Sequence, residues 1–156
     1  MFYLVKTPRW LQAFFPKYIW EKDKEAKTIY LTFDDGPHPQ HTIFVLNELR
    51  KVNAKATFFC IGKNVDSYPD IYNQILAEGH AVGNHTQNHL KGSNTNDDDY
   101  LENINLAAKK IRSKLFRPPY GSIKKRQAKL LLEQNPKMKI IMWTVLSADI
   151  DTEISK

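Results

Sequence analysis

The chain has 156 residues, with 23 Lys and Arg against 17 Asp and Glu, and a formal net charge of +6. Hydrophobic residues make up 42% and charged residues 26%, which is ordinary for a globular protein and excludes a disordered or low-complexity chain. No apolar run reaches the roughly 18–20 residues of a membrane span. The single cysteine, Cys60, excludes an internal disulfide framework. The length therefore predicts one soluble domain with a sizeable core.

The first 27 residues are rich in aromatic and basic side chains. Pro8, Arg9, Pro16 and Lys17 interrupt them, so the continuous apolar stretch of a secretory signal is not visible. We interpret residues 1–27 as an amino-terminal arm that packs on the domain that follows, with weak binding to a membrane surface as the alternative. Because no export signal is visible, a cytoplasmic location is the default expectation, and action at the cell envelope stays open.

Strand-like and helix-like patterns alternate along residues 28–156, which we take as the main domain. Residues 28–33 are β-branched and aromatic and predict a buried strand, and residues 41–52 carry apolar side chains at helical spacing. The alternation then continues, with further strands predicted at 56–61, 80–83, 115–117 and 139–146 and further helices at 69–78, 97–113 and 124–134. This pattern predicts βαβ units around a parallel sheet, with the chemistry at the carboxyl ends of the strands.

Basic residues concentrate between Lys109 and Lys139, where eleven of them are accompanied by one acid, Glu133. The favoured interpretation is a pair of solvated helix faces. The alternative is a surface that attracts an anionic polymer. No recognised nucleic-acid-binding motif accompanies the charge, so we expect no nucleic-acid partner.

Polar groups follow four of the five predicted strands. Loops at the carboxyl ends of parallel strands meet at one edge of a sheet, so these groups are expected to lie near one another. They are Asp34-Asp35-Gly36-Pro37 after the first strand, His85-x-x-x-His89 after the third, Arg117-Pro118-Pro119-Tyr120-Gly121 after the fourth, and Asp149 after the fifth.

Asp34 and Asp35 alone admit two interpretations. Asp-Asp-Gly is often only a turn, but adjacent side chains on an extended backbone point in opposite directions, so one acid could hold a cation while the other faces elsewhere. His85 and His89 would share one face of a helical turn, although such a pair is more often incidental than metal-binding. Combined with a strand-end acid, the histidines make the ligand set of hydrolytic zinc sites and also of non-haem iron centres.

Three strings, TFDDGP (residues 32–37), HTQNH (85–89) and RPPYG (117–121), occur in this order and spacing. They resemble the motifs of polysaccharide deacetylases of carbohydrate esterase family 4, and the resemblance runs from about residue 28 to the carboxyl terminus. It implies a distorted (β/α) barrel, which agrees with the alternation above. It also implies that the chain removes N-acetyl groups from an N-acetylated glycan such as peptidoglycan or chitin.

By this resemblance, Asp35, His85 and His89 would hold a divalent metal, usually zinc, with cobalt, nickel or manganese as alternatives. Asp34 would be the general base that takes a proton from the metal-bound water. Arg117 would hold the Asp34 carboxylate in place and ionised.

The resemblance also assigns roles to the loop after the fourth strand and to the last strand. The main-chain N–H of Tyr120 would stabilise the oxyanion together with the metal. Pro118 and Pro119 would stiffen the loop and, with Trp143, are candidate substrate contacts. Asp149 matches the second acid of the family's fourth motif and is a candidate catalytic residue.

The resemblance is incomplete near the carboxyl end. Leu146 stands where the family has an Asp, Ile150 where it has a Trp, and no match to the last family motif precedes Lys156. That motif's His protonates the leaving amine and partners the acid matched by Asp149, and loss of a general acid typically costs about 10²–10⁴ in rate. We favour a truncated barrel without its final helix and strand over a proteolytic fragment or a barrel completed by another chain. The alternative function is a catalytically silent glycan-binding or interaction domain that retains the metal site.

Overall fold

The computed structural model describes residues 6–22, 25 and 27–147. Five parallel strands form one sheet in the order β1-β2-β3-β4-β5. Their bounds are β1 Thr32–Asp34, β2 Thr57–Cys60, β3 Ala81–Asn84, β4 Leu115–Phe116 and β5 Lys139–Ile140. Sequence order and spatial order coincide, so the sheet winds in one direction, as successive strands of a (β/α) barrel do.

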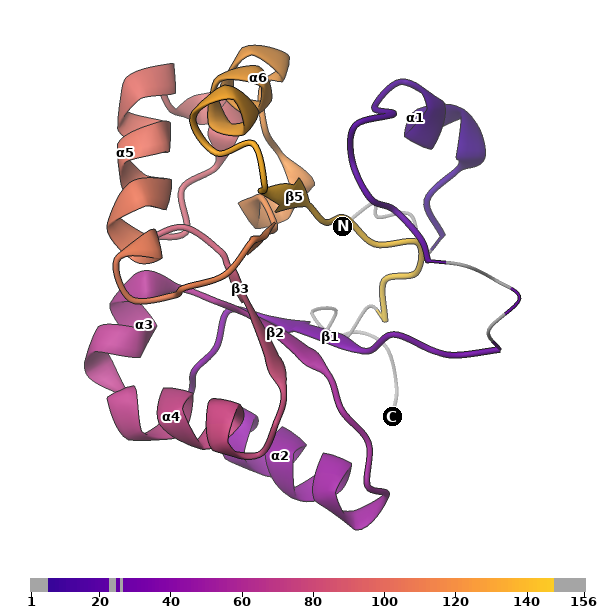
Figure 1. The fold of residues 1–156 in the computed structure, drawn as a ribbon, viewed down its shortest axis with the longest axis vertical. Helices are drawn as coiled ribbons and strands as arrows, with labels where there is room; N and C mark the ends of the chain where they lie inside the picture. Colours follow the sequence, from indigo (N-terminus) through magenta and orange to yellow (C-terminus); the bar gives the residue numbers. More distant parts are fainter. Residues whose placement is uncertain (1–5, 23–24, 26, 148–156) are drawn as a thin grey trace, which may run out of the picture.

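Helices join the successive strands, as the alternating pattern predicts (Figure 1). In chain order they are α1 Arg9–Ala13, α2 His41–Lys51, α3 Gly62–Ser67, α4 Pro69–Ala77, α5 Asp97–Ala108 and α6 Lys125–Gln134, with 3₁₀ turns η1 at Gly92–Asn94 and η2 at Pro119–Gly121. Pro69 occupies the first turn of α4, where its missing N–H is not needed. Asn96 caps α5 by accepting the Asp99 N–H, and the acidic first turn suits the positive helix end.

Two groups of buried side chains form the core around the sheet. The first lies between β2 and helices α2 to α5 and includes Leu46, Phe58, Ile75 and Ile111. The second lies beneath α5 and α6, against β4 and β5; it consists of Tyr100, Leu101, Ile104, Phe116, Ala128, Leu131, Ile140 and Met142. The two groups support opposite halves of the sheet.

The first strand is shorter than its apolar run. Of residues 28–33, only the last two belong to β1, while Ile29 is 85% and Tyr30 57% exposed. The partner strand β2 begins at Thr57, opposite Thr32, so the earlier residues extend past the end of their partner. The prediction of a buried strand was therefore wrong over its first four residues.

The predicted last strand, residues 139–146, is divided between two partners. Its first two residues form β5 and pair with β4, which ends before two prolines that cannot donate ladder hydrogen bonds. Beyond them, Ile141 forms a parallel bridge with Ile19, and Val145 forms an antiparallel bridge with Lys6. The second half of the predicted strand thus pairs with the amino-terminal arm.

The described part of the arm, residues 6–22, packs against the domain. Tyr18 and Trp20 contact the second core group, and the Trp20 indole N–H donates to the main-chain oxygen of Phe15 at 3.3 Å. The division of the chain at residue 27 stays a prediction. Within the described ranges, every helix is too short or too polar to cross a bilayer.

Candidate active site and metal centre

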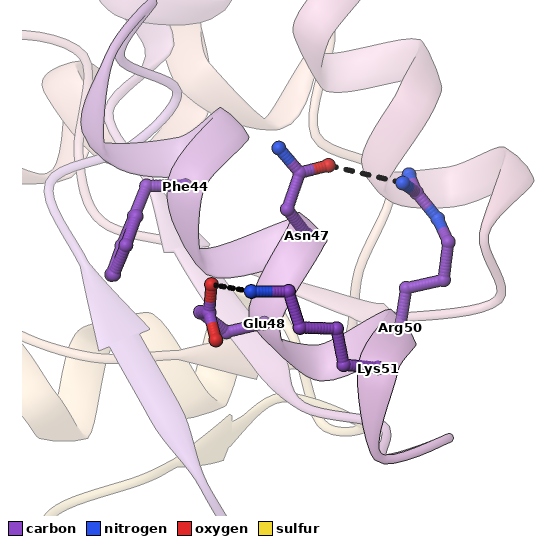
Figure 2. A pocket seen from close by; sticks show the side chains of 5 residues that line it. All are labelled: Phe44, Asn47, Glu48, Arg50 and Lys51. Atoms are coloured by element: carbon purple, nitrogen blue, oxygen red, sulfur yellow. Dashed lines mark hydrogen bonds and ion pairs between the residues drawn. The ribbon is translucent and has the colours of Figure 1, made fainter.

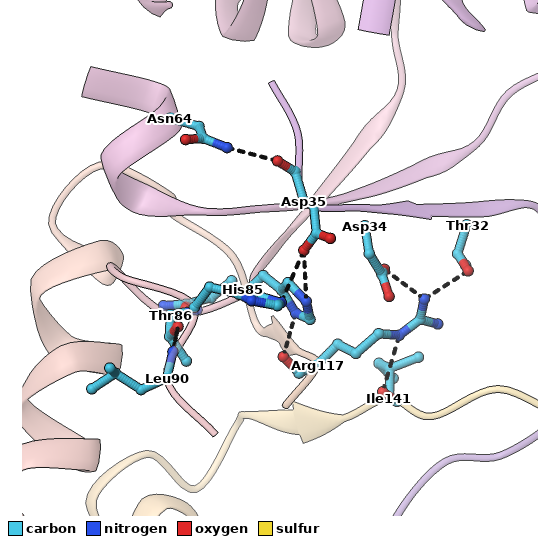
Figure 3. A network of polar contacts seen from close by, with 11 residues as sticks. Thr32, Asp34, Asp35, Asn64, His85, Thr86, Leu90, Arg117 and Ile141 are labelled. Carbon is cyan, nitrogen blue, oxygen red and sulfur yellow. Dashed lines mark hydrogen bonds and ion pairs between the residues drawn. The ribbon is translucent and has the colours of Figure 1, made fainter. Parts of the chain in front are cut away.

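The two acids at the end of β1 have different partners. Asp34 is the last residue of β1, whereas Asp35 has a left-handed φ of 67° that turns the chain away from the strand. Figure 3 shows the Asp35 carboxylate directed at His85 and the Asp34 carboxylate directed at Arg117. The Asn64 side chain donates to the main-chain oxygen of Asp35 at 2.7 Å and holds this turn. Asp34 and Asp35 therefore make specific side-chain contacts and do not only form a surface turn.

Asp35, His85 and His89 offer three ligand atoms that all lie within 4.8 Å of one another. Oδ1 of Asp35 is 3.4 Å from Nε2 of His85 and 3.0 Å from Nε2 of His89. Hydrogen bonding to His85 and then to His89 holds the pKa of Asp35 well below its usual value, although partial burial opposes this shift. The His85 side chain is buried and that of Asp35 is 62% exposed, so the cluster is open on one side.

The donor chemistry of this cluster fits a divalent cation. Nδ1 of His85 lies 2.7 Å from the main-chain oxygen of Arg117, which can only accept, so Nδ1 carries a proton and Nε2 is the ring nitrogen that could bind a metal ion. Two imidazole nitrogens and one carboxylate, with an exposed side, form the usual protein ligand set of a catalytic zinc site. The three residues could therefore hold such an ion.

The two histidines meet in a loop rather than on a helical turn. Thr86 and His89 have left-handed φ values of 66° and 57°, and the segment after β3 forms no helix before η1. The expectation of helical spacing was wrong, although the His85 and His89 rings do come together, with centroids 5.1 Å apart. Left-handed non-glycine residues cost conformational energy and cluster at functional sites.

Helix α3, which the sequence analysis did not predict, holds the histidine loop from one side. The main-chain N–H groups of Gly62 and Lys63 donate to the oxygens of Thr86 and Gln87 at 2.9 and 3.0 Å. A Cβ at Gly62 would stand 2.1 Å from Oε1 of Gln87 and 3.1 Å from Cα of Ala107. A side chain at residue 62 would therefore displace the Gln87 side chain and press on α5.

Two buried asparagines hold the same loop from the other side. Oδ1 of Asn103, on α5, accepts the main-chain N–H groups of Gln87 and Asn88, both at 2.9 Å. Asn84, at the end of β3, accepts the Thr86 N–H at 2.8 Å and donates to the main chain of α5 at 2.9 Å. Sequence reasoning missed both residues, because an Asn within an amphipathic helix or at a strand end carries no signal of such a contact.

Arg117 holds Asp34 by its side chain and is itself almost fully enclosed, with 3% exposure. Nη1 donates to Oδ1 of Asp34 at 2.8 Å and to Oγ1 of Thr32 at 2.7 Å. Nη2 and Nε donate to the main-chain oxygens of Met142 and Ile141 at 3.0 and 3.3 Å. The guanidinium thus connects the ends of β1 and β5.

Aromatic rings complete the surroundings of the guanidinium. The Cζ atom of Arg117 lies 4.1 Å from the centroid of the Phe59 ring and 5.7 Å from that of Trp143. Burial lowers the pKa of Arg117, while the neighbouring Asp34 charge acts in the opposite direction. A paired, stacked and buried arginine in this position is a rigid holder for a carboxylate.

The Arg-Pro-Pro-Tyr-Gly segment forms the wall beside His89. Pro118 and Pro119 are buried, while the Tyr120 side chain is 63% exposed and its ring centroid lies 4.6 Å from that of His89. Tyr120 itself has a left-handed φ of 58° within η2. The turn therefore places an exposed aromatic ring next to the metal cluster.

Trp143 packs behind this turn. A Cβ at Gly121 would stand 2.8 Å from the Trp143 ring, which is half-buried. Substrate contact by Pro118, Pro119 and Trp143 stays a prediction. Asp149 lies outside the described residues, so its role also stays a prediction.

A separate hollow of about 420 Å³ lies on the outer surface of α2 (Figure 2). Phe44, Asn47, Glu48, Arg50 and Lys51 line it. Its charged groups are engaged with their neighbours, since Lys51 contacts Glu48 at 2.6 Å and Arg50 contacts Asn47 at 3.0 Å. It shares no residue with the Asp35 cluster.

The part of the chain that contains the site is similar to known proteins. Residues 21–137 match the polysaccharide deacetylase family. A peptidoglycan-N-acetylglucosamine deacetylase of Bacillus cereus is 49% identical over 110 residues, which cover 67% of this chain and 51% of that protein. A solved peptidoglycan N-acetylglucosamine deacetylase, in complex with 4-naphthalen-1-yl-N-oxidanyl-benzamide, has a TM-score of 0.78 and 35% identity, over 88% of this chain and 65% of that one.

A pseudoenzyme of carbohydrate esterase family 4 from Bacillus anthracis is also similar, with a TM-score of 0.69 and 26% identity. The similar region includes 76% of this chain and 43% of the pseudoenzyme chain. The likeness therefore includes a protein described as a pseudoenzyme as well as proteins named as deacetylases.

The fold is thus the parallel sheet with alternating helices that carbohydrate esterase family 4 builds into a (β/α) barrel. The chain belongs to the polysaccharide deacetylase family. It spans about half the length of the curated relatives it matches.

Proposed function

We propose that this chain is a metal-dependent hydrolase that removes N-acetyl groups from a peptidoglycan-like glycan. The observation that carries the proposal is the pairing of two units at one end of the sheet. One is the Asp35–His85–His89 cluster, and the other is Asp34, held by a buried Arg117. An open ligand set next to an oriented carboxylate is suited to hydrolysis of an amide.

Asp35, His85 and His89 would hold the ion, with zinc first and cobalt, nickel or manganese as alternatives. When bound, a divalent cation supplies a Lewis acid that polarises a carbonyl and lowers the pKa of water. In this proposal Asp35 and the two histidines act only as metal ligands, because their ligand atoms all lie within 4.8 Å of one another.

Asp34 is the proposed general base, since its carboxylate lies beside the cluster without belonging to it. Its Oδ1 accepts from Arg117 at 2.8 Å, and its side chain is 33% exposed, so a water molecule can approach the carboxylate. Arg117 orients the carboxylate and balances its charge. The main-chain N–H of Tyr120 is the proposed donor to the developing oxyanion.

The substrate assignment follows from the relatives. The Bacillus cereus relative is named for N-acetylglucosamine in peptidoglycan, and it shares 49% identity with this chain. Pro118, Pro119 and Trp143 are the proposed wall of the acetyl site, and Asp149 stays a candidate catalytic residue, matched by the resemblance to the acid that partners the leaving-group histidine of the last family motif. The exposed Tyr120 ring next to His89 offers a surface on which a pyranose ring can stack.

The second candidate function is a catalytically silent glycan-binding domain. It is favoured by Leu146, which occupies the position of a family acid, and by the likeness to a family pseudoenzyme. The two candidates differ in turnover and share the metal site.

Acetate release from N-acetylglucosamine oligomers tests the proposal, with the full chain loaded with zinc or cobalt and its metal content measured in parallel. We expect release by the loaded chain and its loss in Asp34→Asn, which keeps an oxygen for Arg117 and should retain the metal. His85→Ala should lose both metal and release. Bound metal with no release from the parent chain would favour the silent domain, and equal metal loss in both variants would contradict the division of roles between Asp34 and Asp35.

A further inference from the structure

The amino-terminal arm is bonded to the chain segment that follows β5. The Ile19 N–H donates to the oxygen of Ile140 at 2.8 Å, and the Met142 N–H donates to the oxygen of Ile19 at 2.8 Å. Ile19 therefore continues the sheet beyond β5 as a single-residue parallel bridge. The arm thus holds the chain on both sides of Ile141, whose own N–H donates to the oxygen of Phe116 in β4 at 2.8 Å.

Thr7 makes a second attachment further along the same segment, at Trp143 and Thr144. Its main-chain N–H donates to the oxygen of Thr144 at 2.9 Å, and its hydroxyl donates to the oxygen of Trp143 at 2.9 Å. Thr7 is 8% exposed, and its own oxygen accepts from the Gln12 side chain at 3.2 Å. The hydroxyl is thus a buried, oriented donor rather than a solvated one.

The segment held by the arm is the segment that holds Arg117. The main-chain oxygens of Ile141 and Met142 accept from Nε and Nη2 of the guanidinium, and the remaining nitrogen, Nη1, donates to Asp34. Met142 is bonded on both sides, with its N–H on Ile19 and its oxygen on Arg117. Displacement of this strand would move the guanidinium and, with it, the Asp34 carboxylate.

Trp143 also connects the arm to the site. Its oxygen accepts from Thr7, and its ring contacts both the guanidinium of Arg117 and the turn at Gly121. Both the arm before residue 21 and the segment after residue 137 lie outside the part of the chain that matches the family. The arm residues that make this contact, Thr7 and Ile19, therefore precede the residues that match the family model.

We propose that Thr7 and Ile19 are positioning residues for the active site and act through the main chain of residues 140–144. They hold the carbonyl groups that orient Arg117, and Arg117 orients Asp34. Only the effect of these two residues on turnover rests on the proposed function. The effect on Arg117 itself is independent of any metal or substrate.

The test compares Thr7→Val with Thr7→Ser in the full, metal-free chain. Valine keeps the branched shape and the main-chain N–H but removes the hydroxyl donor, whereas serine keeps the hydroxyl. The readout is solvent exchange of the Arg117 Nε–H, observed by ¹⁵N NMR. We expect exchange to become roughly fivefold faster in Thr7→Val, the effect of one ordinary hydrogen bond, and to stay near the parent rate in Thr7→Ser.

Ile19→Pro removes the N–H that donates to Ile140 and should accelerate the same exchange, while Trp10→Ala, at a 65% exposed arm position, should not. In the zinc-loaded chain, Thr7→Val should lower kcat, because the Asp34 carboxylate is misplaced, whereas Thr7→Ser should keep the parent kcat. If Arg117 exchange is unchanged in Thr7→Val, the proposal is wrong. It is also wrong if the Arg117 Nε–H and the amides of α4 accelerate equally, because that pattern reports global destabilisation. A parent chain without acetate release would refute the proposed function while leaving the exchange test decisive.

Discussion

Nδ1 of His85 lies 2.7 Å from the main-chain oxygen of Arg117, while Nη1 of the same arginine lies 2.8 Å from Oδ1 of Asp34. One residue thus orients a proposed metal ligand with its backbone and the proposed general base with its side chain. A side-chain substitution leaves the first contact in place and removes the second. The two halves of the site can therefore be separated by experiment.

Arg117→Lys is expected to retain zinc and lose most activity. Lysine keeps a positive charge, but it cannot reproduce the fork that reaches Asp34, Thr32 and the strand carbonyl groups together. We expect kcat to fall by about 10²-fold, at the lower end of the range for general acid–base catalysis. Metal analysis and acetate release on the same sample check this. Loss of zinc in proportion to activity would show that the side chain supports the metal cluster as well.

Asn103→Leu should weaken metal binding without any change to a ligand. Its Oδ1 accepts two N–H groups of the loop that carries His89. Leucine leaves the Asn88 N–H without this partner, whereas the Gln87 N–H keeps its contact of 3.1 Å with the main-chain oxygen of residue 103. Supporting contacts around metal ligands are typically worth 10–100-fold in affinity, so we expect about a tenfold loss of zinc affinity. Asn103→Asp keeps the acceptor oxygen and is the matched control. Chelator competition measures both variants, and parent affinity in Asn103→Leu would contradict this role.

His80 should make the protein less stable in mild acid. Burial is the main cause that lowers the pKa of His80, the Lys55 charge acts in the same direction, and Glu78 opposes both. Its Nδ1 accepts the Ala56 N–H at 3.3 Å, which requires the neutral ring. The unfolded chain binds the proton more readily, with a histidine pKa of about 6.5. The contribution to stability is therefore complete above about pH 6.5 and decreases as the pH falls towards the folded-state pKa.

Urea unfolding at pH 7.5 and pH 5.5 checks this expectation. His80→Gln removes the titrating group, so the difference in unfolding free energy between the two pH values should be smaller in the variant than in the parent chain. An equal difference in both proteins would assign the acid sensitivity to other groups.

Tyr100→Phe should leave the protein as stable as before or make it more stable. The Tyr100 side chain is fully buried, and its hydroxyl has no hydrogen-bond partner among the described residues. Removal of a buried unsatisfied hydroxyl relieves its desolvation cost, so we expect a gain of up to about 1 kcal/mol in the free energy of unfolding. Tyr100→Ala, by contrast, would open a cavity and cost several kcal/mol, about 3–5 by analogy with Phe→Ala. A clear loss of stability in Tyr100→Phe would reveal a bound water or another partner.

Much of the site could be predicted because its residues follow predicted strands. Asp34 ends β1 and Asp35 follows it, while His85 follows β3 and Arg117 follows β4, as the alternating pattern implied. The two adjacent carboxylates do diverge, but not by alternation along a strand: Asp35 lies after β1 and its left-handed φ of 67° directs its side chain. The helical spacing of His85 and His89 failed, since a pattern of four residues cannot reveal a left-handed φ at Thr86.

The sequence by itself determined the alternating fold, the chemical types at the strand ends and the family, because those properties are recorded in short strings and local periodicity. Only the tertiary structure decided how the groups are held. The Thr7 hydroxyl and the oxygen of Trp143 are 136 positions apart in the chain, and Arg117 is 83 positions from Asp34. No local pattern encodes such a contact. It exists because burial brings distant segments together and requires each buried donor to find an acceptor.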